Sequence, residues 1–149
     1  MLSIVKVEQS HIEEAYKNGR EYMKAMSYED GTNLTSAYIN AGPSIAVLEK
    51  NGSLVGLGGI ILTNFGVGCA WACLTPKITK YPVGMTRISK TFIEKSATDY
   101  QLHRVDVLVD VNFPKAFEWA KALGFEEEGL LRKVGPNKND SFIMAYLPE

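Results

Sequence analysis

The sequence predicts a single domain with a mixed α/β fold, and three observations carry this prediction. An Asn51-Gly52 pair lies between two β-rich runs, which is typical of a tight antiparallel hairpin. Residues 67–111 read as strand, helix and strand, the order that joins parallel neighbours through a right-handed crossover. The length of 149 residues and the 46% hydrophobic content suit one core. We therefore expect a mixed sheet with an antiparallel N-terminal hairpin and a splayed parallel strand pair, flanked by helices.

The N-terminal third predicts a short strand over residues 2–7, then a helix. Ser10 and Glu13 have the S-x-x-E spacing of a capping box, which marks a helix start. Apolar and small residues follow at helical spacing: Ile12, Ala15, Tyr16, Gly19, Met23 and Met26. A second, short helix is expected near residues 34–39.

The hairpin strands are predicted over residues 44–50 and 54–62. Gly56, Gly58 and Gly59 weaken the second of these, unless a bulge or a close backbone approach is needed there. A further, strongly apolar strand covers residues 67–74 and ends at Thr75-Pro76.

The second half alternates helices and strands. Residues 83–100 have one apolar helical face, and residues 104–111 alternate with valines on one side. Pro114 suits the first turn of the next helix, and Gly124 ends it. Two closing strands are expected between residues 125 and 147, around a turn at 135–140.

Charge and composition exclude several classes of function. With 16 basic and 17 acidic residues there is no overall basic field, so we expect no nucleic-acid partner. Cys69, Cys73 and the two histidines lack the spacing of metal ligands, so no metal is expected. No run approaches the roughly 18 apolar residues of a membrane span. We therefore expect a cytoplasmic protein without a membrane partner.

Residues 109–132 carry a resemblance to a known family. A strand ends in Asn, and a short helix then leads through Lys-x-Leu-Gly-Phe to Glu-Gly and a basic residue. Leu-Gly-Phe alone is better explained as a helix stop before a core aromatic, but here it occurs together with the element order and the Val55-Gly56 pair after the hairpin. Together these features resemble the GCN5-related N-acetyltransferase (GNAT) family over the whole chain. The residues in the first segment are Asn112, Lys121, Leu123, Gly124, Phe125, Glu128, Gly129 and Arg132.

The resemblance implies an acyl-CoA-dependent N-acyltransferase that uses acetyl-CoA as co-substrate and no metal. The helix N-terminus after the fourth strand would hold the pyrophosphate, although Val83 and Met85 stand where small residues are expected and Pro82 removes one N–H donor. The implied cofactor-binding residues are Leu74, Thr75, Lys80, Tyr81, Pro82, Val83, Gly84, Met85 and Asn112. The basic residues near this helix start fit a solvated face as well as an anion site; they are Lys77, Lys80, Arg87 and Lys90.

The catalytic positions depart from the family pattern. The fourth strand, residues 67–74, has no carboxylate to serve as a base. Ala120 stands where the family often has a tyrosine that acts as the general acid. Glu29 is a candidate base, with Asp30 beside it, and Tyr81 and Tyr146 are candidate acids. Each of these residues is also explained as an ordinary loop or strand residue.

Two functions therefore remain open. The first is acetyl transfer to an amine on a small molecule or a protein. Whether the protein is a homodimer is left open. The second is a catalytically silent GNAT-like binding or structural protein, similar to degenerate members found in bacteriophages. Trp71, with Cys69 and Cys73 on the same strand face, is either core or one wall of an acceptor cleft.

Overall fold

The computed structural model describes residues 1–19 and 35–149, and its elements follow the predicted order. The strands are β1 (Ser3–Val5), β2 (Ser44–Leu48), β3 (Leu54–Asn64), β4 (Val67–Leu74), β5 (Arg104–Asp110), β6 (Glu126–Leu131) and β7 (Ser141–Tyr146). The helices are α1 (Gln9–Asn18), α3 (Thr35–Asn40), the 3₁₀-helix η1 (Pro76–Lys80), α4 (Pro82–Asp99) and α5 (Pro114–Ala122).

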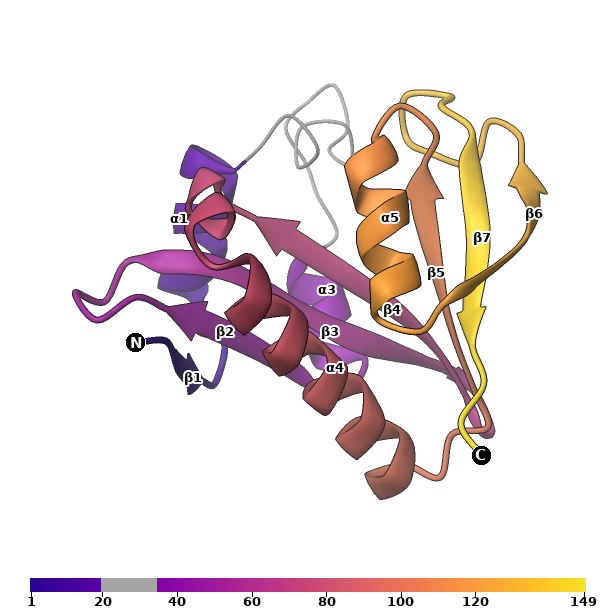
Figure 1. Ribbon diagram of the computed structural model, residues 1–149, viewed down its shortest axis with the longest axis horizontal. Helices are drawn as coiled ribbons and strands as arrows, with labels where there is room; N and C mark the ends of the chain where they lie inside the picture. Colours follow the sequence, from indigo (N-terminus) through magenta and orange to yellow (C-terminus); the bar gives the residue numbers. More distant parts are fainter. Residues whose placement is uncertain (20–34) are drawn as a thin grey trace.

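All seven strands belong to one mixed sheet in the order β1-β2-β3-β4-β5-β7-β6. Neighbouring strands are antiparallel except β4 and β5, which are parallel and joined through α4. Helices α4 and α5 lie on one face of this sheet, and α1 and α3 lie on the other (Figure 1). The predicted mixed α/β fold is confirmed.

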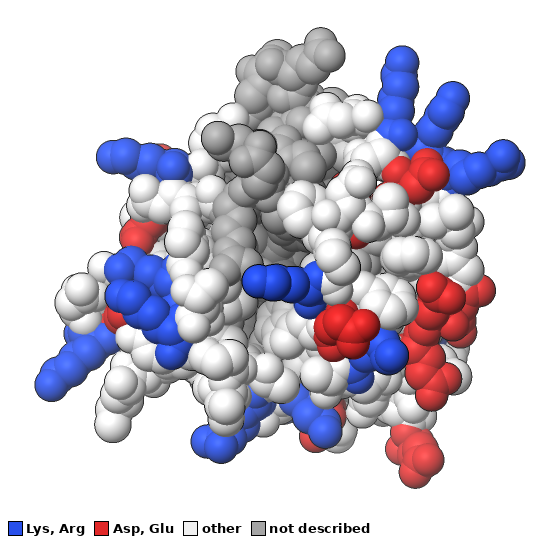
Figure 2. Space-filling view, turned by 45° about the horizontal axis from the view of Figure 1, so that its top comes forward, with Lys and Arg blue, Asp and Glu red and all other residues white. Residues whose placement is uncertain are grey.

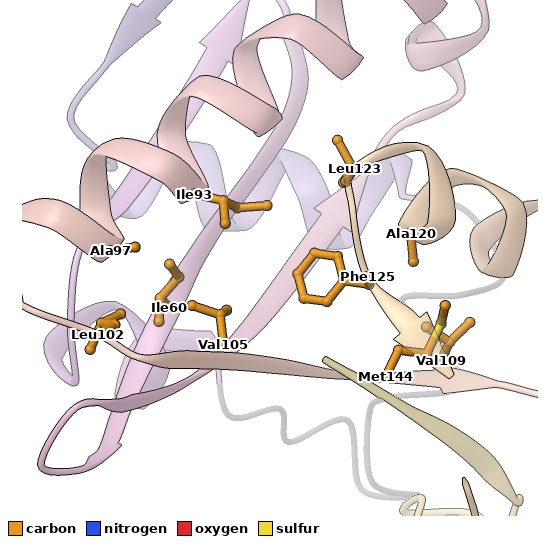
Figure 3. Close-up of a cluster of buried hydrophobic side chains, with 10 residues drawn as sticks. All are labelled: Ile60, Ile93, Ala97, Leu102, Val105, Val109, Ala120, Leu123, Phe125 and Met144. Atoms are coloured by element: carbon orange, nitrogen blue, oxygen red, sulfur yellow. The ribbon is translucent and has the colours of Figure 1, made fainter. Parts of the chain in front are cut away.

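The hydrophobic core is divided between the two faces of the sheet. On the face of α4 and α5, Phe125 packs with strand and helix residues in one buried cluster (Figure 3). Gly124, with φ +102°, ends α5 and turns the chain so that Leu123 and Phe125 both enter this cluster. On the other face, Ile12 and Ala15 of α1 pack with strand residues. The Leu-Gly-Phe segment thus positions α5 against the sheet.

Strands β4 and β5 pair over only part of their length. Their register runs from Val67↔Arg104 to Ala70↔Val107 and then stops. Beyond that point β3 keeps β4 paired as far as Leu74, and β7 keeps β5 paired as far as Asp110. Because each strand follows its outer neighbour in a twisted sheet, the two diverge toward their C-terminal ends. The predicted parallel and splayed pair is confirmed.

A β-bulge sits in β3 at the end of this splay. Leu48 pairs with Leu54 and Val47 with Gly56, so Val55 is an extra residue in β3. The hydroxyl of Thr75, which is 2% exposed, lies 3.0 Å from the Leu54 carbonyl oxygen and 2.9 Å from that of Val55. A bulge, one of the two explanations that the sequence leaves open for the glycines, is thus present at Val55, and Thr75 holds the end of β4 against it.

The first helix differs from its prediction at both ends. Glu8, not Ser10, is the N-cap, and its backbone N–H donates to Nδ1 of His11 at 2.9 Å. The helix ends at Asn18, since Gly19 has an extended backbone. Met23 and Met26 of the predicted stripe lie outside the described residues. The capping box expected from Ser10 and Glu13 was therefore wrong, because an acidic cap two residues earlier is used instead.

The short helix η1 was also not predicted from the sequence, because Thr75-Pro76 reads as a strand end. Thr75 caps it by accepting a hydrogen bond from the Lys77 backbone N–H at 3.3 Å. With Pro76 at its first position, η1 carries the chain from β4 to α4.

Replacing Thr75 with Val should destabilise the protein by about 1–3 kcal/mol, because the change removes the buried hydroxyl that lies against the Leu54 and Val55 carbonyl groups and caps η1. Urea unfolding followed by circular dichroism measures this loss. Thr98→Val is the matched control, since its hydroxyl caps an exposed carbonyl in α4. Equal stability of the two variants would contradict the role assigned to Thr75.

Candidate functional site

The splay between β4 and β5 opens into a cavity of about 840 Å³, within the size range of small-molecule sites. Residues from β3, β4, β5, α4 and α5 line it, and most of them are apolar. Among the described residues, the lining contains no Asp or Glu, and Lys115 is its one basic residue. The cavity is therefore a mostly apolar slot with a few polar groups.

The backbone of β4 offers this cavity hydrogen-bonding groups that have no pairing strand among the described residues. The N–H of Thr75 donates to the Val55 carbonyl at 3.1 Å. Since alternate residues of an antiparallel strand bond to the partner strand, this contact fixes which residues of β4 bond to β3. The N–H and C=O groups of Ala72 and Leu74 therefore point away from β3, toward β5. Pairing with β5 stops at Ala70, and both residues line the cavity. An extended chain with amide groups fits such an edge.

Polar side chains lie where the chain passes from β5 to α5. The backbone N–H of Asn112 donates to Oδ1 of Asp110 at 2.8 Å. Asp110 is itself buried and accepts a further hydrogen bond from the side-chain amide of Asn139. The buried carboxylate thus fixes the turn that brings Asn112 and Lys115 to the cavity.

A hydrogen bond joins the two helices beside the cavity. The indole Nε1–H of Trp119 in α5 donates to Oγ1 of Thr86 in α4 at 3.0 Å. The Thr86 hydroxyl in turn donates to the Pro82 carbonyl at 2.7 Å. Both Trp119 and Thr86 line the cavity, so this contact sets the spacing of the helices around it.

The start of α4 is tied to the β2–β3 hairpin. The phenol of Tyr81 donates to Oε2 of Glu49 at 2.5 Å, and Nζ of Lys77 lies 2.8 Å from Oε1. The hydrogen bonds from Lys77 and Tyr81 lower the pKa of Glu49, and the same contact with Glu49 raises the pKa of Tyr81. Gly84 faces the N-terminal segment, since a Cβ there would lie 3.2 Å from Cδ1 of Leu2.

The structure brings some of the predicted site residues together and separates others. The predicted cofactor-binding residues that line the cavity are Leu74, Pro82, Met85 and Asn112. The remaining ones lie in the adjoining turn and helix start without lining it; they are Thr75, Lys80, Tyr81, Val83 and Gly84. Part of the predicted set is thus gathered around the splay.

The predicted catalytic residues are not gathered there. Tyr146 pairs with Val105, near the end where β4 and β5 are still joined, and burial is the main cause of its raised pKa. Tyr81 is bound to Glu49 on the hairpin. Glu29 and the adjacent Asp30 lie outside the described residues.

The strand face of Trp71 serves the core and the cavity together. Trp71 and Cys73 belong to the buried cluster on the α1 face, and Trp71 also lines the cavity. Its indole Nε1–H is buried without a hydrogen-bond partner among the described residues, which costs about 1–3 kcal/mol. Burial, reinforced by Asp106, raises the pKa of the Cys69 thiol to about 12, so this thiol stays protonated.

The polar lining residues that were not predicted from the sequence include Thr86, Lys115 and Trp119. Each comes from the first turns or the middle of a helix whose apolar stripe the sequence shows well. The signal that was present is the position of Lys115 directly after Pro114, in the first turn of α5 next to Asn112.

Basic and acidic side chains are both scattered over the surface. In Figure 2, acidic side chains gather along the right-hand edge, while basic ones occur on several sides. Glu126, Glu127 and Glu128 of the edge strand β6 are all exposed. Across residues 1–19 and 35–149 there is no cluster of three or more metal-ligating side chains of the His, Cys, Asp or Glu type. Within the same ranges, no helix has the length and apolar character needed to cross a membrane.

Comparison of folds finds a consistent set of neighbours. Spermidine N-acetyltransferase SpeG from Vibrio cholerae, in complex with CoA and spermine, superposes with a TM-score of 0.74 and 22% identity, covering 98% of this chain and 95% of that chain. A chimera of the Vibrio cholerae enzyme with hSSAT gives a TM-score of 0.75 at 22% identity, with the same two coverages. A point mutant of the Vibrio cholerae enzyme gives 0.74 at 21% identity, covering 98% of this chain and 93% of that one. The chain thus has the fold of these acetyltransferases, the GNAT fold that the sequence predicts.

At this level of identity the likeness is one of fold. No family model matches the sequence, and no curated protein matches it.

The contacts of Glu49 should make stability depend on pH in a defined direction. A lowered pKa means that the carboxylate stabilises the fold above its ordinary value of 4.5, and that this contribution is lost as the pH falls through the lowered value. Glu49→Gln should therefore be less stable than the parent at neutral pH, with the difference shrinking as the pH falls below 4.5 and through the lowered pKa of Glu49. Urea unfolding across this range measures the difference.

The matched control is Glu118→Gln, which changes an exposed carboxylate on α5. The difference in stability between Glu118→Gln and the parent should not shrink comparably as the pH falls. Tyr81→Phe tests the other partner: the raised pKa means that Tyr81 stabilises the fold below its ordinary value of 10.0 and that this is lost at higher pH. A stability difference for Glu49→Gln that stays constant with pH would contradict the assignment.

Proposed function

We propose that the protein is an acyl-CoA-dependent N-acyltransferase. One observation carries the proposal: the unpaired backbone edge of β4 faces a cavity of about 840 Å³ at the point where β4 leaves β5. The fold of the neighbours supports it, because one of them is in complex with CoA and spermine.

The pantetheine arm of CoA matches this edge chemically. It is extended and carries two amide groups, so it can exchange hydrogen bonds with Ala72 and Leu74 in place of the missing strand. Apolar walls from α4 and α5 would cover its carbon chain. The phosphates would lie toward the mouth, where the start of α4 supplies free N–H groups and Lys115 supplies a positive charge.

Transfer forms one bond and breaks another. The acceptor amine, as the neutral base, attacks the thioester carbonyl carbon; a carbon–nitrogen bond forms, the carbon–sulfur bond breaks, and CoA leaves with a proton on its sulfur. A backbone N–H in the segment from Ala72 to Thr75 would stabilise the oxyanion. This donor does not depend on side-chain identity.

The acceptor is proposed to be a small-molecule or protein amine. Spermine is the amine in the neighbouring complex, but a polycation needs carboxylates around it, and the described lining supplies none. Trp71 instead offers an aromatic wall whose indole N–H has no hydrogen-bond partner among the described residues. Spermidine and spermine belong in an acceptor screen beside neutral and aromatic amines.

A second function is binding of a CoA thioester without efficient transfer. It is favoured by the lack of proton-transfer side chains at the usual positions. Strand β4 has no carboxylate, Ala120 lines the cavity where the family often has tyrosine, and Tyr81 is engaged with Glu49. An ordered water or Glu29 remains the proposed base. The phage-type likeness, the cytoplasmic location and the homodimer stay predictions from the sequence.

Acetyl-CoA should bind and raise the melting temperature, since a ligand of the folded state stabilises it by mass action. Lys115→Glu should weaken binding at least about tenfold, or ~1.4 kcal/mol, by placing a negative charge beside the phosphates. Titration calorimetry measures both. Lys90→Glu is the matched control, because this exposed lysine of α4 lies outside the described lining. Absence of binding at millimolar acetyl-CoA would refute the proposal.

Acetyl transfer to generic amines should be barely above background, because the acid and base that each contribute ~10²–10⁴-fold are absent from their usual positions. Ala120→Tyr should raise the rate above that of Ala120→Phe, which adds the same bulk without the hydroxyl. A coupled assay of free CoA release measures this. Turnover of the unmodified protein in the ordinary range of ~1–10³ s⁻¹ would show that another residue supplies the proton chemistry.

A further inference from the structure

Part of the cavity lies away from the splay, beneath α4. The register of the sheet places Ile45, Gly58 and Ala72 in one row across β2, β3 and β4. All three line the cavity, as does Ser89 in the middle of α4. We call the space bounded by Gly58, Ala72 and Ser89 the α4 hollow. It exists because three small residues meet where a helix normally packs large side chains onto a sheet.

Large apolar side chains close the hollow on its other sides. Next to the row of Gly58, Val47 pairs with Gly56, and Val47 packs with Met85 of α4 in a buried cluster. One turn further along α4, Ile93 packs with Ile60 in the main core. The walls are therefore buried hydrocarbon, and the row between them is the place where the packing between α4 and the sheet is open.

The hollow is continuous with the slot proposed for the pantetheine arm. Ala72 belongs to both: its backbone faces the unpaired edge toward β5, while its side chain lies on the α4 face of the sheet with that of Ala70. A thioester carbonyl held at the Ala72 backbone thus has the hollow directly beside it.

The cavity is larger than an acetylated arm requires. A 150 Å³ cavity holds benzene, or about 25 Å³ for each non-hydrogen atom, so an acetyl-pantetheine arm of roughly 20 such atoms occupies on the order of 500 Å³. Of the 840 Å³ present, on the order of 300 Å³ remains. That is room for about ten further non-hydrogen atoms, shared between the acceptor beside Trp71 and an acyl chain in the α4 hollow.

We propose that the α4 hollow binds the aliphatic chain of an acyl-CoA, and that the preferred donor carries a straight acyl group of about four to ten carbons rather than acetyl. This inference rests on the proposed function, because it takes the thioester to lie at the Ala72 edge. The chain enters with its second carbon near Ala72 and runs between Gly58 and Ser89 toward Ile45.

The test is a series of saturated CoA thioesters titrated against the unmodified protein by calorimetry. Each methylene buried should tighten binding up to about fourfold, so hexanoyl-CoA should bind at least about tenfold tighter than acetyl-CoA. The gain should end when the hollow is full. A flat series with measurable acetyl-CoA binding would overturn the α4 hollow and leave the proposed function standing, whereas no binding of any thioester would overturn both.

A filled hollow gives the second arm of the test. Ser89→Leu places a branched side chain in the space from the helix side, where no backbone has to move. It should remove the advantage of hexanoyl-CoA over acetyl-CoA, while the matched variant Ser89→Ala should keep it. Melting temperatures of both variants show whether they fold. An undiminished advantage in folded Ser89→Leu would place the acyl chain elsewhere and refute the proposal.

Discussion

The divergence of β4 from β5 is the constraint on which the rest of the site depends. Each strand is held along its outer edge, β4 by β3 and β5 by β7, and the twist of the sheet separates their ends. Among the described residues, the separation leaves the half-buried β4 backbone at Ala72 and Leu74 without a pairing strand, and backbone groups that are shielded from water without a partner are costly. The cavity follows from this gap, while Asp110 fixes the turn at Asn112 and the Leu-Gly-Phe segment positions α5 beside it. A ligand that completes the ladder relieves the same cost.

In the proposed function, backbone groups at the splay bind the co-substrate, while the side chains for proton transfer differ from the family pattern. Backbone groups are supplied by the register of the sheet, so they persist through side-chain change. General acids and bases are single side chains, so one substitution removes them; the family resemblance predicts that Ala120 and the strand from Val67 to Leu74 lack the groups in this chain. The phenol of Tyr81, which sequence reasoning offers as a replacement, is engaged by Glu49. Binding and chemistry in this molecule thus rest on different kinds of groups.

The sequence predicts the fold well because its signals are local. Asn51-Gly52, the alternating valines of β5 and Gly124 each act within a few residues, and the strand β4 has the predicted bounds. The start of α1 was misjudged because Glu8 and Ser10 both suit a cap, and the choice between them depends on His11. The contact of Tyr81 with Glu49 joins residues 32 apart in the chain, so no local pattern indicates it. The α4 hollow is harder still to predict, since it depends on residues that are small at three separate places in the chain.

The positions of the tryptophans have an optical consequence. The chain contains two, Trp71 and Trp119, and both line the cavity. Trp71 has a buried indole N–H with no hydrogen-bond partner among the described residues, and the indole N–H of Trp119 donates to Thr86. Tryptophan fluorescence of this protein therefore comes only from side chains in the walls of the site. The colour and intensity of that emission make the protein its own unlabelled reporter of what fills the space between α4, α5 and the sheet.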